Sequence, residues 1–173
     1  MKRTLLFAFV ALFSVSAFAE KPIKVVSGST KFLKQANGYV EVEIRWDETQ
    51  WKDGENMKEA LNPTTYDDYV NRAESSFVEG FNSKTSNIKV STTESGKYHM
   101  IIDVKKVDHF YSVTSIIPGN KHTVWATITI IDNETKENVC VMEATRLKGG
   151  RDFAIDDSFS KCFLALGESV AEL

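Results

Sequence analysis

The sequence predicts an α+β fold in which a mostly antiparallel sheet carries two helices on one face. Two patterns support this class. Several segments alternate apolar and polar residues, as strands with one wet face do, and two segments repeat apolar residues every three to four positions, as amphipathic helices do. Elements with one apolar face each bury it in a two-layer sandwich, here in the order ββα(β)βββα.

The first nineteen residues are expected to be a signal peptide. The chain opens MKRTLLFAFVALFSVSAFAEK, in which two cations precede an apolar run and small residues precede a cleavage point between Ala19 and Glu20. The alternative, a membrane anchor, needs roughly 20 apolar residues, and this run is shorter. We therefore expect residues 1–19 to be removed, leaving a single α+β domain at 20–173 in the periplasm or secreted, with no membrane anchor.

The charge of the chain argues against a nucleic-acid partner. The formal net charge is −3, and removal of the signal peptide takes two further cations away. Proteins that bind phosphate backbones cluster Lys and Arg instead. An anionic membrane surface is disfavoured for the same reason.

A strand is predicted at residues 40–46, which read VEVEIRW, with apolar and polar side chains in alternation. Asn37-Gly38 just before it is a hairpin signal. Its antiparallel partner is therefore expected at residues 24–33, with Gly28 allowing a bulge.

Three further alternating runs lie at residues 98–105, 123–131 and 139–147, and a short strand is expected at 88–90. Residues 132–136 read DNETK and form the turn between the second run and the third. This spacing is typical of antiparallel neighbours.

Both predicted helices have a single apolar stripe. Pro63 and Thr64-Thr65 begin the first helix, and Gly80 is expected to weaken its end. The stripe of the first helix consists of Tyr66, Tyr69, Val70, Ala73, Phe77 and Phe81, and that of the second of Phe159, Phe163, Leu166, Val170 and Leu173.

The segment GGRDFAIDDSF at residues 149–159 has the composition of either a ligand-binding loop or a helix start. Gly149-Gly150 can end the last strand, Asp152 or Asp156 can cap the next helix, and Asp156 and Asp157 suit its first turn. These aspartates disfavour a phosphate there. The spacing of a calcium loop is missing. Helix capping is therefore the favoured interpretation.

No catalytic motif stands out in the chain. His99, His109 and His122 lie in no metal-binding spacing and are expected to be exposed strand histidines. A nucleophile elbow, a phosphate-binding loop and a dinucleotide fingerprint are all missing from the sequence. The sequence therefore predicts no catalytic residues, no metal and no cofactor.

An acidic segment offers an alternative function. Residues 46–59 include WDETQWKDGE, in which four carboxylates lie between and after Trp46 and Trp51. Exposed indole rings stack on sugars, and paired carboxylates hydrolyse glycosidic bonds. The alternative is therefore a hydrolase of envelope carbohydrate or peptide with this loop as its site.

Cys140 and Cys162 are the two cysteines of the chain. An exported protein can form a disulfide, and a strand and a helix could bring these two together. The other interpretation is two buried free thiols. The sequence leaves both open.

The sheet face away from the helices is the candidate binding surface. On the strand 123–131 the even-numbered residues take the core side, so the odd-numbered ones face outward. A partly apolar, uncovered face is typical of an interaction site. Trp125 would instead be covered if the segment 112–120 or the loop around Trp51 folded over it. The candidate residues are Trp125, Thr127, Thr129, Tyr39, Ile101 and His99.

The segments VVSGSTKFLK, YVEVEIRWDETQW, SSFVEGFNSK and GGRDFAIDDSFSKCFLALGESVAEL resemble a family of small exported, functionally uncharacterised proteins of Bacteroidetes-type bacteria. The resemblance implies a Gram-negative source and a periplasmic or cell-envelope location. It implies no site residues. Together with the sequence patterns, it leads to the expectation of a non-enzymatic binding module whose partner is an unknown envelope protein or small ligand.

Overall fold

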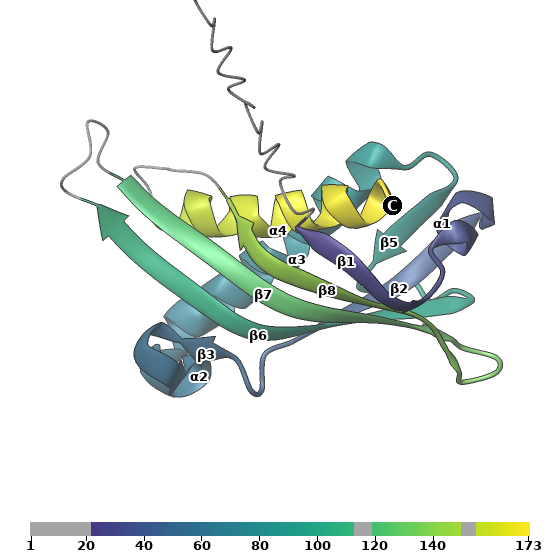
Figure 1. Ribbon diagram of the computed structural model, residues 1–173. Helices are drawn as coiled ribbons and strands as arrows, with labels where there is room; N and C mark the ends of the chain where they lie inside the picture. The colour runs from purple at the N-terminus through teal and green to yellow at the C-terminus, as the bar shows by residue number, and fades with distance from the viewer. Residues whose placement is uncertain (1–21, 113–118, 150–154) are drawn as a thin grey trace, which may run out of the picture.

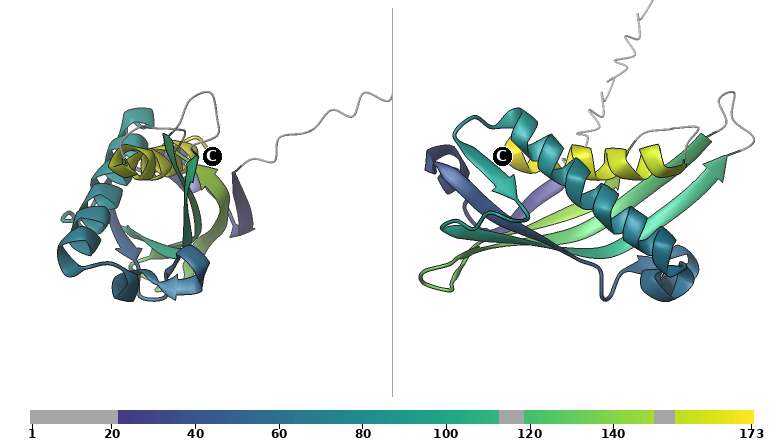
Figure 2. Two further views of the ribbon diagram at one scale, coloured as in Figure 1. Left: turned by 90° about the vertical axis from the view of Figure 1, so that its left-hand side faces the viewer. Right: turned by 180° about the vertical axis from the view of Figure 1, so that it is seen from behind.

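The computed structural model describes residues 22–112, 119–149 and 155–173, so the predicted signal peptide lies outside the described residues. The α+β two-layer prediction is confirmed. One open sheet carries the two long helices, α3 (Pro63–Lys84) and α4 (Ile155–Ala171), on one face (Figures 1 and 2).

The main path of the sheet runs in the order β1-β8-β7-β6-β2-β5. The first four of these strands are antiparallel neighbours, whereas β2 runs parallel to both β6 and β5. The strands are β1 (Ile23–Gly28), β2 (Gly38–Arg45), β5 (Ile88–Ser91), β6 (Tyr98–Ser112), β7 (Gly119–Asp132) and β8 (Asn138–Lys148).

Short elements complete the described chain. The strand β3 (Gln50–Trp51) pairs with both β6 and β4 (Glu55–Asn56). The helices α1 (Lys31–Gln35) and α2 (Met57–Ala60) and the 3-10 turn η1 (Lys52–Gly54) were not predicted from the sequence.

The predicted hairpin between residues 24–33 and 40–46 is wrong. The strand β1 ends at Gly28 and pairs with β8, and residues 31–35 form α1, whose Leu33 is buried. Gly38 does have the positive φ (98°) that favoured a turn, but its N–H donates to Asn87 and opens a parallel pairing. Parallel strands need a long crossover rather than a tight turn, and α3 provides it between β2 and β5.

The strand predictions at 98–105, 123–131, 139–147 and 88–90 are confirmed, as is the turn at 132–136. On β7, the predicted core side is buried: Val124, Ala126, Ile128 and Ile130 are all 3% exposed or less. The alternation held because both neighbours of β7 are antiparallel strands that share its apolar face.

The helical stripes are confirmed at their centres, since Phe77, Phe81, Phe159 and Phe163 are fully buried. The helix α3 begins as predicted at Pro63, although Asn62 rather than a threonine is its cap: the Asn62 side chain accepts from Thr65 N at 3.0 Å.

Two glycines allow α3 and α4 to touch backbone to backbone. A Cβ on Gly80 would lie 2.1 Å from the carbonyl oxygen of Leu164, and a Cβ on Gly167 would lie 2.3 Å from that of Phe77. Gly80 was interpreted as a weak point near the helix end. It is instead a contact point between helices, which brings the aromatic stripes of both onto the sheet.

The last strand and α4 meet in the same way at Gly149. A Cβ at this position would lie 2.1 Å from the carbonyl oxygen of Ser158. Because α4 begins at Ile155, Asp156 and Asp157 fall in its first turn as predicted. Arg151 and the proposed cap Asp152 lie outside the described residues.

A side-chain amide from α3 occupies the free edge of β5. Asn82 Oδ1 accepts from Val90 N at 2.8 Å, and Asn82 Nδ2 donates to Val90 O at 3.0 Å. These are the two backbone groups that another strand would otherwise pair with. Asn82 therefore satisfies the edge within the chain.

Replacing Asn82 with alanine is expected to lower the free energy of unfolding by about 2 kcal/mol, because Val90 is buried and would keep two unpaired backbone groups. Equilibrium denaturation in urea would measure the loss. Asn71→Ala, at an exposed position of the same helix, is the matched control and should change stability by less than about 0.5 kcal/mol. Equal effects of the two substitutions would contradict this account of the edge.

Candidate functional site

The outer face is the face of β2, β6, β7 and β8 that points away from α3 and α4. Cross-strand register brings several candidate residues into line there: Ile101 lies opposite Thr129, and Thr127 lies opposite Asp103. His99, Trp125, Thr127 and Thr129 are half-buried, and Ile101 is only 8% exposed.

Tyr39 belongs to the same face but lies apart from the others. It sits at the start of β2, two positions before Glu41, which is the residue paired with His99. Its side chain is 49% exposed. The structure therefore gathers the predicted residues of β6 and β7 into one strip and leaves Tyr39 at the margin.

At the β2 border of the outer face, Glu43 is paired with Arg45 and His99. Arg45 donates two hydrogen bonds to Glu43, at 2.7 and 2.9 Å, and His99 Nε2 lies 3.4 Å from the same carboxylate. The hydrogen bond from Arg45 holds the pKa of the Glu43 carboxyl below its ordinary value. Because the side chains of Arg45 and Glu43 are 42% and 44% exposed, this pair adds little stability, but it neutralises the border of the strip.

A bulge at Lys105 extends the strip beyond the predicted residues. The register shifts between Val104 and Lys106, so that Lys106 lies opposite Trp125, with its Nζ 5.2 Å from the centre of the indole ring. The same shift brings Phe110 to the outer side, where it is 63% exposed. Sequence reasoning missed Phe110 because it ended this strand at residue 105.

The acidic segment does not form the sugar platform that was considered for it. Trp46 is 4% exposed and packs against Phe163 in a tilted arrangement with ring centres 5.4 Å apart, and Trp51 is 6% exposed and meets Tyr69 edge-on at 5.4 Å. Both indoles are in the core because β3 joins the sheet and directs Trp51 toward α3. No sugar can stack on either ring.

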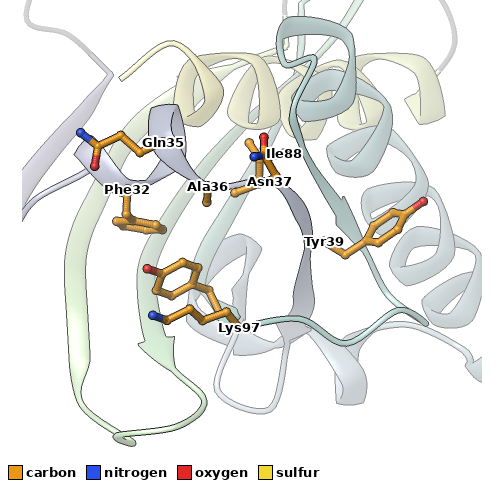
Figure 3. Close-up of a pocket in the computed structure, with 8 residues that line it drawn as sticks. Phe32, Gln35, Ala36, Asn37, Tyr39, Ile88 and Lys97 are labelled. Atoms are coloured by element: carbon orange, nitrogen blue, oxygen red, sulfur yellow. The ribbon is translucent and has the colours of Figure 1, made fainter.

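A groove opens where α1 meets the start of β2 (Figure 3). Its volume is about 310 Å³. Phe32 and Tyr98 pack against each other in its wall, tilted by 45° with ring centres 4.5 Å apart, and Lys97 lies beside Tyr98. Other lining residues are Gln35, Ala36, Asn37, Tyr39 and Ile88.

The most unusual polar group of the described chain is His122. It was expected to be an exposed strand histidine, but it is fully buried. Its Nδ1 lies 2.6 Å from Ser158 Oγ, and its Nε2 is buried with no hydrogen-bond partner. Burial, together with the charges of His109 and Lys52, lowers the pKa of His122 to about 3. The alternation of β7 places residue 122 on the core side, and this signal was present in the sequence.

Cys140 and Cys162 are free buried thiols, and the disulfide that the sequence left open is not formed. Cys162 Sγ donates to the carbonyl oxygen of His122, whereas Cys140 pairs with Ile130, eight residues further along β7. That stretch of strand spans roughly 26 Å, and a disulfide needs Cα atoms within about 7 Å. Burial raises the pKa of the Cys162 thiol to about 12.

Among residues 22–112, 119–149 and 155–173, no group of three or more His, Cys, Asp or Glu side chains is placed to hold a metal ion. None of the described helices is long and apolar enough to cross a membrane.

No protein-family model matches the chain, and comparison with curated proteins finds no relative. Solved structures give distant matches. The PelC dodecamer from Paraburkholderia phytofirmans is 15% identical over 86% of this chain and 96% of its own, with a TM-score of 0.44. A Xanthomonas campestris protein of the family DUF330 is 13% identical over 77% of this chain and 82% of its own, with a TM-score of 0.39.

A third match is a Helicobacter pylori homologue of a neuraminyllactose-binding hemagglutinin. It is 5% identical over 79% of this chain and 82% of its own, with a TM-score of 0.35. At such scores no property of these three proteins is transferred to this chain.

Proposed function

We propose that this chain is an exported, non-enzymatic binding protein of a Gram-negative cell envelope, located in the periplasm or secreted, and that it binds its partner through the outer face. The observation that carries the proposal is the placement of both long helices on one face of the sheet. Within residues 22–112, 119–149 and 155–173, no helix lies over the opposite side of four strands (Figure 2). The signal-peptide pattern of residues 1–19 supports the export part.

The composition of the strip favours a protein partner over a small ligand. Threonine hydroxyls alternate with Ile101 and Trp125, and Glu43 at the border is paired with Arg45 and His99. Protein interfaces combine such apolar centres with polar rims, and aromatic residues are enriched in them. Small ligands prefer concave sites. The hollow beside the strip is lined by Arg45, Asp103 and Lys105 and takes in none of Trp125, Thr127 and Thr129.

The location of the contact can be tested with a photo-crosslinking amino acid at Thr127. The matched control carries it at Glu79, which is exposed on α3, the helix layer of the sandwich. Cross-linked products formed in cells at position 127 and not at 79 are expected. Equal products at both positions, or products at 79 alone, would refute the outer face as the contact surface.

Trp125→Ala is expected to reduce the yield of that cross-linked product at least several-fold while changing the thermal midpoint by no more than about 2 °C. The reason is that the half-buried indole contacts Lys106 on the outer side rather than the core between sheet and helices. Cross-link yield and calorimetry on the same preparation measure both quantities. A large fall in the midpoint would show that Trp125 stabilises the fold instead.

A further inference from the structure

His122 joins β7 to the first turns of α4 through two contacts. Its ring is within hydrogen-bond distance of Ser158 Oγ, at 2.6 Å, and its backbone carbonyl accepts from Cys162 Sγ at 3.3 Å. Further along α4, the helix is fixed to α3 by the close approach at Gly167. The contacts of His122 therefore fall on the first half of α4, which the close approach of Gly149 to Ser158 also holds.

The surroundings of the ring suit a neutral imidazole. Aromatic rings from three elements enclose it: Trp51 of β3 at 6.1 Å, Tyr69 of α3 at 6.2 Å and Phe159 of α4 at 5.4 Å. The fourth neighbour is another histidine, His109 of β6, stacked nearly parallel at 4.6 Å and 15°.

A proton on His122 would have no acceptor on one side. An imidazolium donates from both nitrogens, and Ser158 Oγ can accept from Nδ1 only. Nε2 is buried without a partner. The groups that act on its charge are His109 of β6 and Lys52 of η1, both of which oppose a positive charge; the other titratable neighbours are Tyr69 of α3 and the Cys162 thiol of α4.

Aromatic ring faces can stabilise a cation by about 0.5–2 kcal/mol, and this contribution would favour a protonated His122. Desolvation of a fully buried group exceeds that contribution, since it shifts a pKa by up to 3–5 units. The lowered pKa of His122 agrees with this balance, because burial is the largest cause of its shift.

We propose that His122 is an acid-sensitive contact: its protonation releases the first two turns of α4, residues 155–162, from β7 while the rest of the sandwich stays folded. The opening uncovers the rings of Trp51, Tyr69 and Phe159, so acid would create an apolar surface at this end of the molecule. This inference does not depend on the proposed binding face, which lies on the other side of the sheet.

The direction with pH follows from the lowered pKa in the closed state. We call α4 closed when residues 155–162 pack on β7 and open when they are released. The closed form is favoured most above pH 6.5, the pKa of an exposed histidine. It becomes less favoured as the pH falls toward the pKa of His122 in the closed form. Between pH 7.5 and pH 5 the ratio of closed to open α4 should fall about 30-fold.

Hydrogen–deuterium exchange measured by mass spectrometry from pH 7.5 to pH 5, corrected for the intrinsic exchange rate at each pH, tests this. Peptides covering 155–162 of the wild type should lose protection about 30-fold, and peptides covering 77–84 of α3 should lose less than about 3-fold. The double variant His122→Phe/Ser158→Ala should show no such loss at 155–162. His99→Gln, a histidine change on the outer face, should behave as the wild type.

The same pH response in the double variant and the wild type, or equal loss in both helices, would overturn the proposal. If the double variant does not fold, the comparison of residues 155–162 with residues 77–84 in the wild type still tests the proposal. Nitrogen-15 spectra of the imidazoles at pH 5 should show no protonated His122 in molecules whose α4 is closed. A charged His122 inside the closed structure would overturn the proposal.

Discussion

Replacement of Phe163 by alanine is expected to lower the free energy of unfolding by about 3–5 kcal/mol, the cost of removing a fully buried phenylalanine ring from a packed core. The ring is 0% exposed and contacts Trp46 and Phe159, whose ring centres are 5.4 and 5.1 Å away. It therefore joins α4 to β2 and its following loop. Denaturation in urea at neutral pH, with the slope of the transition checked for two-state behaviour, would measure the loss.

The matched control is Phe110→Ala, the same substitution at a ring that is 63% exposed on the outer side of β6. It should change stability by no more than about 0.5 kcal/mol. If Phe163→Ala cost less than about 1 kcal/mol, the apolar stripe of α4 would not be the core stripe that the structure describes.

Gly167→Ala is expected to destabilise the protein by about 3 kcal/mol, although alanine favours a helix over glycine by about 1 kcal/mol. The new Cβ would lie 2.3 Å from the carbonyl oxygen of Phe77 and 2.6 Å from the amide nitrogen of Phe81. Both are backbone atoms, so the helices themselves must separate, and the aromatic contacts beneath them loosen.

The stability of Gly167→Ala can be measured by thermal and urea unfolding, with Ser169→Ala as the matched control. Ser169 lies two residues further along the same helix and is half-buried, so its alanine variant should keep wild-type stability within about 0.5 kcal/mol. A Gly167→Ala protein at least as stable as the wild type would show that helix propensity, not the close approach, governs this position.

Local periodicity was enough to predict the helices and most strands. The stripe around Phe77 and the alternation around Ile128 each report which side of one element is apolar, and this depends only on neighbours in sequence. The pairing of β2 was not predictable in this way. Asn37-Gly38 carries a hairpin signal, but the partners of β2 are β5 and β6, which begin only at Ile88 and Tyr98, and the sequence near β2 gives no indication of either.

The candidate surface was predicted in part for the same reason. The outward residues of β7 followed from alternation, whereas Phe110 depended on the bulge at Lys105, which shifts the pattern by one residue. The burial of Trp46 and Trp51 depends on tertiary packing against Phe163 and Tyr69. His122 was misjudged because a histidine on the core side of a strand was treated by residue type rather than by position.

The pairing of β1 with β8 sets the order in which the protein can fold. Ile23 finds its partner Ala144 about 120 residues later in the chain, so the first strand cannot be stabilised in the sheet until nearly all of the sequence is available. Such distant pairing slows folding, because a long loop must close first. The first strand therefore stays unpaired until β8 has been synthesised and, if the protein is exported as proposed, this end of the chain would meet the translocation machinery in the extended state that passage requires.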